Sequence, residues 1–131
     1  MLRDLIRVIS NRGGQVSVVD ERCELFPGDC FRAGASTDIL SGCGKSDGLS
    51  AVLRSMGPQW IAVDEISDAQ DCDALLQAGW CGVKLLATAH AGALSDLRRR
   101  ECYRSLLDSR LFTTVVVLRA DRQWTVERIC L

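Results

Sequence analysis

Two strand-like segments that end in polar side chains constrain the fold of this 131-residue chain most strongly. Segment 60–65 (WIAVDE) is apolar until its last two residues, Asp64 and Glu65, and after one helical segment 84–90 (KLLATAH) ends in two hydrogen-bonding side chains. Parallel strands buried on both faces read as apolar runs. Because ligands of open α/β sheets bind at the carboxyl ends of the strands, the pattern predicts a site at that edge.

The residue types at these two strand ends favour phosphate chemistry. In P-loop nucleotide hydrolases the Asp of such a pair helps to hold Mg²⁺. A Glu that follows it commonly orients or deprotonates the attacking water. Thr88 and His90, at the end of the next strand, are placed to reach a terminal phosphate. An apolar run that ends in Asp-Glu occurs by chance in many α/β proteins, so the pair of strand ends is stronger evidence than either alone.

Composition gives no sign of a nucleic-acid or membrane partner. The net charge of −1 gives no electrostatic reason to expect nucleic acid or a membrane surface. Apolar runs fall well short of the roughly 18 residues that span a bilayer. The N-terminus, MLRDLIRVIS, is amphipathic and contains Asp4, which is unlike a secretory signal. The length suits one globular domain with one ordinary core.

Seven cysteines are scattered singly, without a C-x-x-C pair, and the chain has one histidine. This spacing does not predict a zinc site. We interpret the cysteines as reduced thiols that pack as small hydrophobic residues. A redox-active or thiol-dependent binding module is the alternative.

Helical and strand periodicities alternate along the chain. Helices are predicted over 2–11, 47–56, 68–78 (capped by Ser67) and 94–109 (one helix or a bent pair), and strands over 15–20, 60–65, 84–88, 112–119 and 124–131. The order predicts a mostly parallel sheet with helices on both faces and an antiparallel hairpin at one edge.

Segment 23–44 is predicted to be a long loop with a turn of helix at 37–40. Within it, GCGKS at 42–46 looks like the end of a phosphate loop, GxxxxGK[ST]. The position five residues before Gly44 is Ile39 instead of glycine, and no predicted strand precedes the segment, as that motif requires. We therefore interpret 42–46 as a turn that leads into the next helix, with a phosphate cradle as the alternative.

Five blocks of sequence carry a more specific signal, in order along nearly the whole chain. They are LRDLIRVIS at 2–10, VVDERCE at 18–24, TDILSGCGKSDG at 37–48, LRSMGPQWIAVDEI at 53–66 and ATAHA at 87–91. Together they resemble the ATPase domain of the stage III sporulation protein AA family, a RecA-like, AAA-type branch of P-loop ATPases related to secretion ATPases. The resemblance implies a three-layer α/β/α fold.

The resemblance also implies that a strand and a Gly-rich phosphate loop, the Walker A motif, precede residue 2 in the family. Residues 1–131 are therefore expected to form one partial ATPase domain, the C-terminal part of a P-loop core that lacks its first strand. Because that loop and its Lys hold the β- and γ-phosphates, we expect the chain alone to bind ATP poorly. Lys45 is not expected to substitute. Unpaired strand edges predict marginal stability.

Site roles follow from the resemblance residue by residue. Asp64 would coordinate Mg²⁺ through water in the Walker B position, and Glu65 would activate the hydrolytic water. Thr88 and His90 would sense the γ-phosphate. Plain strand-end charges, or a histidine satisfied within the structure, are the alternatives.

The remaining roles concern the rim of the same cleft and the assembly. Asp20, Glu21 and Arg22 would line the cleft, with Arg22 as a candidate phosphate contact; the alternative for Asp20 is a turn former. Arg54 would act across a subunit boundary as an arginine finger.

The resemblance implies a cytoplasmic, Mg²⁺-dependent ATPase on the mother-cell side of the forespore membrane. It would assemble as a homo-oligomeric ring with other sporulation channel proteins and power a channel or secretion-like assembly. The alternative is an inactive or truncated remnant that acts only through protein contacts.

Overall fold

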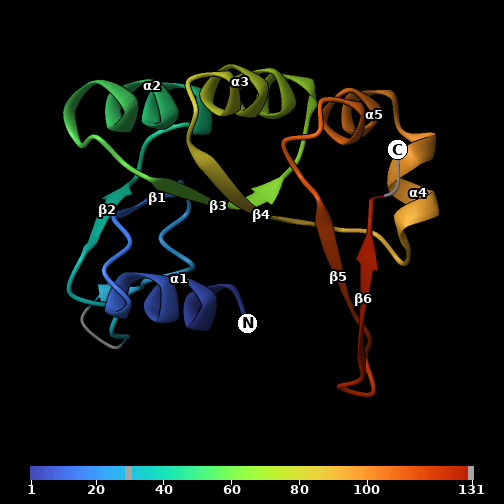
Figure 1. Cartoon of the computed structure of the whole chain (residues 1–131), viewed down its shortest axis with the longest axis horizontal. Coiled ribbons are helices and arrows are strands. Elements are labelled where there is room, and N and C mark those ends of the chain that lie inside the picture. The colour runs from blue at the N-terminus through green and yellow to red at the C-terminus, as the bar shows by residue number, and fades with distance from the viewer. Residues whose placement is uncertain (29–30, 130–131) are drawn as a thin grey trace.

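A four-stranded parallel sheet forms the centre of the fold in the computed structural model, which describes residues 1–28 and 31–129 (Figure 1). The strand order is β2-β1-β3-β4. The strands are β1 (Val16–Asp20), β2 (Thr37–Ser41), β3 (Trp60–Ile66), β4 (Lys84–Ala89), β5 (Thr114–Leu118) and β6 (Trp124–Arg128). The helices are α1 (Leu2–Asn11), α2 (Lys45–Ser55), α3 (Ala69–Trp80), α4 (Leu94–Arg99) and α5 (Glu101–Asp108). The predicted α/β fold with a mostly parallel sheet and a C-terminal antiparallel hairpin is confirmed.

Helices cover both faces of the sheet because its strands are apolar on both faces. All five residues of β1 are buried. Val16 and Val18 belong to the core cluster that contains Ile6 of α1. Val19, which points to the opposite face, packs in a larger cluster with Leu49 of α2. Figure 1 shows α1 on one side of the sheet and α2 and α3 on the other.

Two local predictions were wrong. Residues 37–40 form strand β2 instead of a turn of helix, and they pair in parallel with β1 (Val18 opposite Ile39). The pairing satisfies backbone groups that a single helical turn would leave free, and so overrides the weak local signal. Segment 42–46 therefore does follow a strand. The cap of α3 is Asp68 instead of Ser67, because the Asp68 carboxylate accepts a hydrogen bond from the Asp71 amide.

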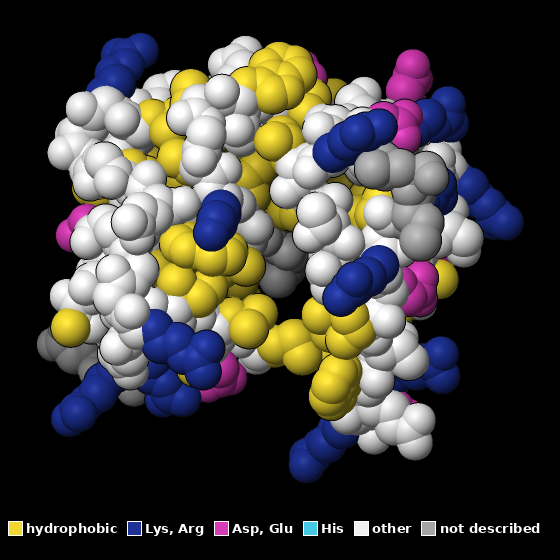
Figure 2. Space-filling view, in the orientation of Figure 1, with side chains coloured by type: hydrophobic (Ala, Val, Ile, Leu, Met, Phe, Trp, Pro, Cys, Tyr) yellow, Lys and Arg dark blue, Asp and Glu magenta, His cyan; other side chains and the backbone are white. Residues whose placement is uncertain are grey.

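The C-terminal hairpin is a two-stranded sheet of its own within the described residues, instead of an extension of the sheet edge. Its cross-strand pairs include Val116 with Val126 and Leu118 with Trp124. All four side chains are more than a third exposed, and Figure 2 shows this apolar surface on the hairpin in yellow. Across the described ranges, helices are too short and polar to cross a bilayer.

The described cysteines are free thiols: Cys23, Cys43, Cys72, Cys81 and Cys102. Cys30 and Cys130 lie outside the described residues. Cys72 of α3 packs in the larger core as a small hydrophobic residue, as predicted, with Cys102 of α5 against the same cluster. Burial, together with the nearby Cys102, raises the pKa of the Cys72 thiol to about 12.

The raised pKa of Cys72 predicts a loss of stability at alkaline pH. The unfolded thiol ionises near pH 9 while the folded thiol stays neutral until about pH 12, so the unfolded state loses its proton first as the pH rises. The free energy of unfolding should fall across that window by an amount on the order of 4 kcal/mol from this group. Urea unfolding at several pH values checks it; an equal pH slope in Cys72→Ala would contradict it.

Gly48 allows α2 to approach β1 closely. A Cβ added at Gly48 would lie 2.5 Å from Cγ1 of Val19 and 3.1 Å from the sulfur of Cys43. We expect Gly48→Ala to lower the free energy of unfolding by about 1–3 kcal/mol, because overpacking outweighs the gain in helix propensity. Ser50→Ala, at an exposed position of the same helix, should be near neutral. Urea unfolding that ranks the two variants in the opposite order would contradict this packing argument.

Candidate functional site

The carboxyl ends of three neighbouring strands bring the predicted site residues to one edge of the sheet. Strand β3 pairs in parallel with β1 on one side and with β4 on the other. Glu65 lies directly opposite Thr88, and His90 follows the end of β4 by one residue. The predicted adjacency of the two strand ends is therefore confirmed.

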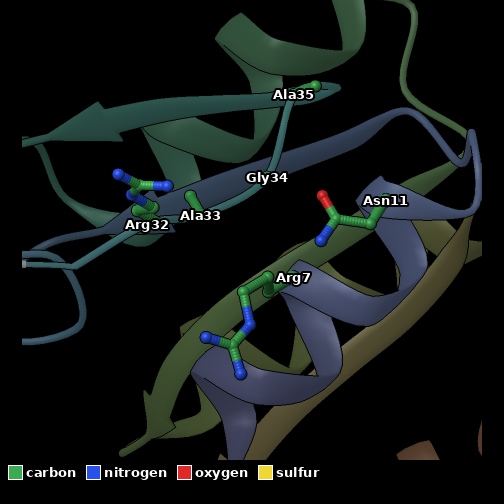
Figure 3. A pocket seen from close by; sticks show the side chains of 6 residues that line it. All are labelled: Arg7, Asn11, Arg32, Ala33, Gly34 and Ala35. Carbon is green, nitrogen blue, oxygen red and sulfur yellow. The ribbon is translucent and has the colours of Figure 1, made fainter.

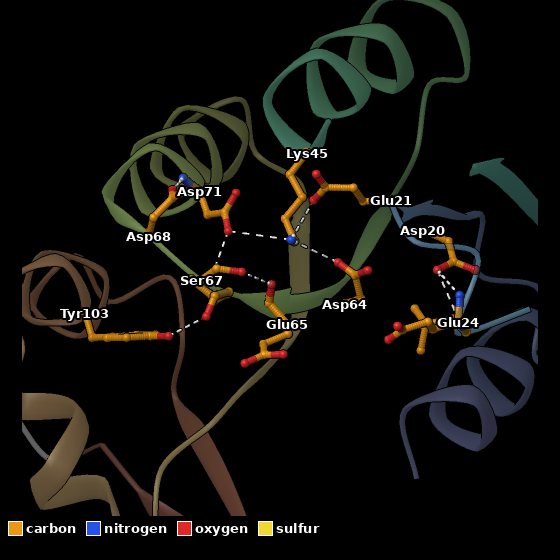
Figure 4. Close-up of polar contacts among 12 residues, drawn as sticks. Asp20, Glu21, Glu24, Lys45, Asp64, Glu65, Ser67, Asp68, Asp71 and Tyr103 are labelled. Carbon is orange, nitrogen blue, oxygen red and sulfur yellow. Dashed lines mark hydrogen bonds and ion pairs between the residues drawn. The ribbon is translucent and has the colours of Figure 1, made fainter. Parts of the chain in front are cut away.

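A bulge at Asp64 changes the face of the sheet to which each carboxylate of β3 points. The register with β4 moves from Val63 opposite Ala87 to Glu65 opposite Thr88, which leaves Asp64 as an extra residue. A bulge of this kind re-aims side chains next to a site. Asp64 is only 8% exposed and points toward α2 and α3, whereas Glu65 is exposed and points away from them (Figure 4). One carboxylate is thus enclosed and the other is available to solvent.

Lys45, which the sequence reasoning set aside as a loop residue, lies among the carboxylates of this edge. It is the first residue of α2 and only 5% exposed. Its Nζ lies 2.9 Å from Oε2 of Glu21, 3.2 Å from Oδ1 of Asp64 and 3.6 Å from Oδ2 of Asp71 (Figure 4). The Gly-Lys dipeptide just before a predicted helix was the sequence feature that could have pointed to Lys45. It indicates a site at the strand ends only once strand β2 is known to precede it.

The ion pairs of this cluster stabilise the charged form of Lys45 more than the charged form of Asp64. Burial opposes the charged form of Lys45, but the hydrogen bond to Glu21 and the charges of Asp64 and Asp71 outweigh it and raise its pKa. Burial also raises the pKa of Asp64, and Lys45 offsets this only in part. Both directions are consistent because one ammonium serves three carboxylates, so it gains more than any one of them does.

Asp20, predicted to line the cleft, is fully buried and bound by its own chain. Its carboxylate accepts hydrogen bonds from the backbone amides of Glu24, Leu25 and Phe26 at 2.9–3.2 Å. These bonds hold the loop that follows β1 against the α1 face of the sheet. This geometry supports the turn-forming alternative, while a nucleotide contact for Asp20 stays a prediction.

Hydrogen bonds also hold the chain immediately after Glu65. The Tyr103 hydroxyl of α5 donates to the carbonyl of Ile66. The Ser67 amide donates to Oδ2 of Asp71, the oxygen that faces Lys45. Both polar groups of the peptide unit that joins Ile66 to Ser67, just before the α3 cap, are therefore held, which restricts where Glu65 lies.

The remaining predicted residues are exposed. Thr88 and His90 lie at the end of β4, and Arg22 follows β1 at the same edge of the sheet. Arg54 is in the last turn of α2, which runs from the carboxyl ends of the strands back toward their amino ends. It therefore lies away from Asp64 of its own chain, and its role at a subunit boundary stays a prediction.

The carboxyl edge of the sheet offers a Mg²⁺ ion one carboxylate ligand instead of a complete set of protein ligands. Oδ1 of Asp64 is buried and makes no aligned hydrogen bond among the described residues. Oxygen is the ligand that Mg²⁺ prefers, and sites that use one or two carboxylates with substrate phosphates are common. In the described ranges, no three ligand side chains are arranged to enclose a metal. Asp64 is thus the residue that would hold the ion.

A hollow of about 450 Å³ lies elsewhere, between α1 and the segment that leads into β2 (Figure 3). Arg7 and Asn11 line it from the helix, and Arg32 and Gly34 line it from the segment. It contains none of the carboxylates at the strand ends. We therefore place the candidate site at the carboxyl edge, where the side-chain chemistry converges.

Comparison with known proteins identifies the family. Residues 1–129 match the family model described as "Sporulation stage III, protein AA". The chain belongs to this family. It is 36% identical over 141 residues to stage III sporulation protein AA of Bacillus subtilis (strain 168), an alignment that covers 98% of this chain and 45% of that protein. The chain thus spans less than half the length of this sporulation relative.

A solved structure extends the likeness at the level of the fold. The ATPase DotB of Legionella pneumophila superposes with a TM-score of 0.58 at 19% identity, over 97% of this chain and 39% of DotB. At this identity the likeness shows the fold alone. The sporulation family member therefore has the fold of part of an ATPase, as the five sequence blocks implied.

The hydrogen bonds to Asp20 predict a structural role that can be measured. Asp20→Asn should lower the free energy of unfolding by about 1.5–3 kcal/mol, because a charged acceptor of three amides becomes neutral. Asp73→Asn, at an exposed position of α3, should change it by less than about 0.5 kcal/mol. Equal effects in urea unfolding would show that the three bonds contribute little.

Proposed function

We propose that this chain supplies the hydrolytic edge of a Mg²⁺-dependent ATPase in a stage III sporulation assembly. The observation that carries the proposal is the placement of Asp64 and Glu65 beside Thr88 at the carboxyl edge of a parallel sheet. Ligands of open α/β sheets bind at that edge. The fold shared with part of an ATPase supports the choice of a nucleoside triphosphate.

Each residue has one task in the proposed reaction. Asp64 holds the ion, which when bound neutralises charge on the β- and γ-phosphates. The carboxylate of Glu65 accepts a proton from a water molecule whose oxygen attacks the γ-phosphorus, as the bond to the leaving oxygen of ADP breaks. The Thr88 hydroxyl donates a hydrogen bond to a γ-phosphate oxygen. His90 and Arg22, exposed at the same edge, are the further phosphate contacts.

The phosphate loop that the resemblance places ahead of residue 2 would supply the cradle for the β- and γ-phosphates. Hydrolysis by the edge described here depends on that loop. The family supports a role in a sporulation channel assembly, and we propose a homo-oligomeric ring in which Arg54 reaches a neighbouring subunit. Such a ring would place Arg54 near a second copy of the edge, which its own chain does not do.

The hairpin favours a second candidate function, a non-catalytic protein that acts through contacts. Val116, Leu118, Trp124 and Val126 expose apolar surface on one hairpin. Exposed apolar patches mark protein interaction sites in many proteins. This candidate predicts that nucleotide hydrolysis is absent even when a phosphate loop precedes the chain.

Glu65→Gln tests the proposed reaction directly. In a longer protein that carries the phosphate loop ahead of residue 2, the substitution should lower kcat for ATP by about 10²–10⁴-fold, because the base is removed. ATP affinity should be retained. Glu101→Gln, exposed on α5, is the matched control and should leave kcat unchanged. Turnover that survives Glu65→Gln would exclude the role of Glu65, and no turnover in the parent protein would favour the contact function.

A further inference from the structure

The buried ammonium of Lys45 lies where positive charge at Asp64 would otherwise be supplied by an ion. Its Nζ is 3.2 Å from Oδ1 of Asp64. A Mg²⁺ ion held by Asp64, directly or through water, would draw on the same negative charge. Because like charges repel each other at short range, Lys45 in this position opposes the binding of an ion at the Asp64 carboxylate.

The Lys45 ammonium can move away from Asp64 and still keep two of its three carboxylate partners. Its aligned hydrogen bond is to Glu21, at 2.9 Å, and Asp71 lies 3.6 Å away. The contact with Asp64 lacks hydrogen-bond alignment. The ammonium can therefore leave Asp64 and keep two carboxylates, whereas Asp64 without Lys45 is a buried carboxylate left without a charge partner.

We propose that Lys45 is a built-in competitor of the divalent cation: it neutralises Asp64 while the ion is absent and withdraws toward Glu21 and Asp71 when the ion binds. The inference rests on the proposed function in one respect, that Asp64 is the residue that holds the ion. The Lys45 ammonium stabilises the Asp64 carboxylate without the ion and weakens binding of the ion alone. Phosphates that arrive with the ion then strengthen its binding.

The competition has a direct readout in metal binding to this 131-residue chain, without any turnover. Lys45→Met should bind Mn²⁺ about tenfold or more tightly than the parent chain. A neighbouring unit charge commonly changes the proton affinity of a carboxylate by one to three powers of ten, and we take the lower end of that range for the ion. Mn²⁺ is added as the chloride and its binding is followed by electron paramagnetic resonance. Lys45→Arg, which keeps the charge, should show no gain. Lys84→Met changes the second lysine of the chain, on β4, and should also show no gain. The gain should disappear in Lys45→Met combined with Asp64→Asn.

A second measurement needs no variant and so does not depend on the folding of Lys45→Met. The chain has two lysines, so ¹³C-lysine labelling gives two side-chain signals. Addition of Mg²⁺ should shift the Lys45 signal and leave the Lys84 signal in place.

The outcomes separate this inference from the proposed function. Mn²⁺ binding that is lost in Asp64→Asn but not tightened in Lys45→Met would overturn the competition and leave Asp64 as the ion-binding residue. An unmoved Lys45 signal while Mn²⁺ broadens the Asp64 carboxyl signal would do the same. No Mn²⁺ binding at Asp64 in either the parent or Lys45→Met would overturn both the competition and the proposed role of Asp64.

Discussion

One buried ammonium group connects the elements that form the carboxyl edge of this protein. Lys45 begins α2, and its three carboxylate partners come from the segment after β1, from β3 and from α3. Without a cation at their centre these carboxylates would repel one another in a poorly solvated space. The position of Asp64, and with it the chemistry proposed for the edge, therefore depends on the charge of Lys45.

The packing of the sheet explains how a lysine reaches that place. Gly48 allows α2 to lie directly against Val19 of β1, one turn after Lys45. The bulge in β3 then turns the Asp64 carboxylate toward the same side. On the opposite face Asp20 is occupied by the loop that follows β1. Neighbouring acidic residues at one edge thus have different tasks: one fixes a loop, and another faces the cation.

Sequence alone predicted most of the fold and part of the site. The apolar run before Asp64 and Glu65 sufficed to place both residues beside Thr88, because parallel strands that follow one another around a helix commonly pair. The pattern failed at β2, where pairing with β1 decides the structure of a weakly periodic segment. That error concealed Lys45, since its approach to Asp64 depends on tertiary distances that no local spacing contains. Similarly, nothing in the sequence distinguishes the enclosed Asp64 from the exposed Glu65.

A double-mutant cycle on the free energy of unfolding tests the central claim, that Lys45 and Asp64 stabilise each other across α2 and β3. Lys45→Met, Asp64→Asn and their combination would each be measured by urea unfolding. The account predicts a coupling energy of at least about 1 kcal/mol, because Lys45→Met leaves the Asp64 carboxylate buried without a charge partner, and that cost disappears when Asp64 is changed as well. Effects that add to within about 0.5 kcal/mol would contradict it.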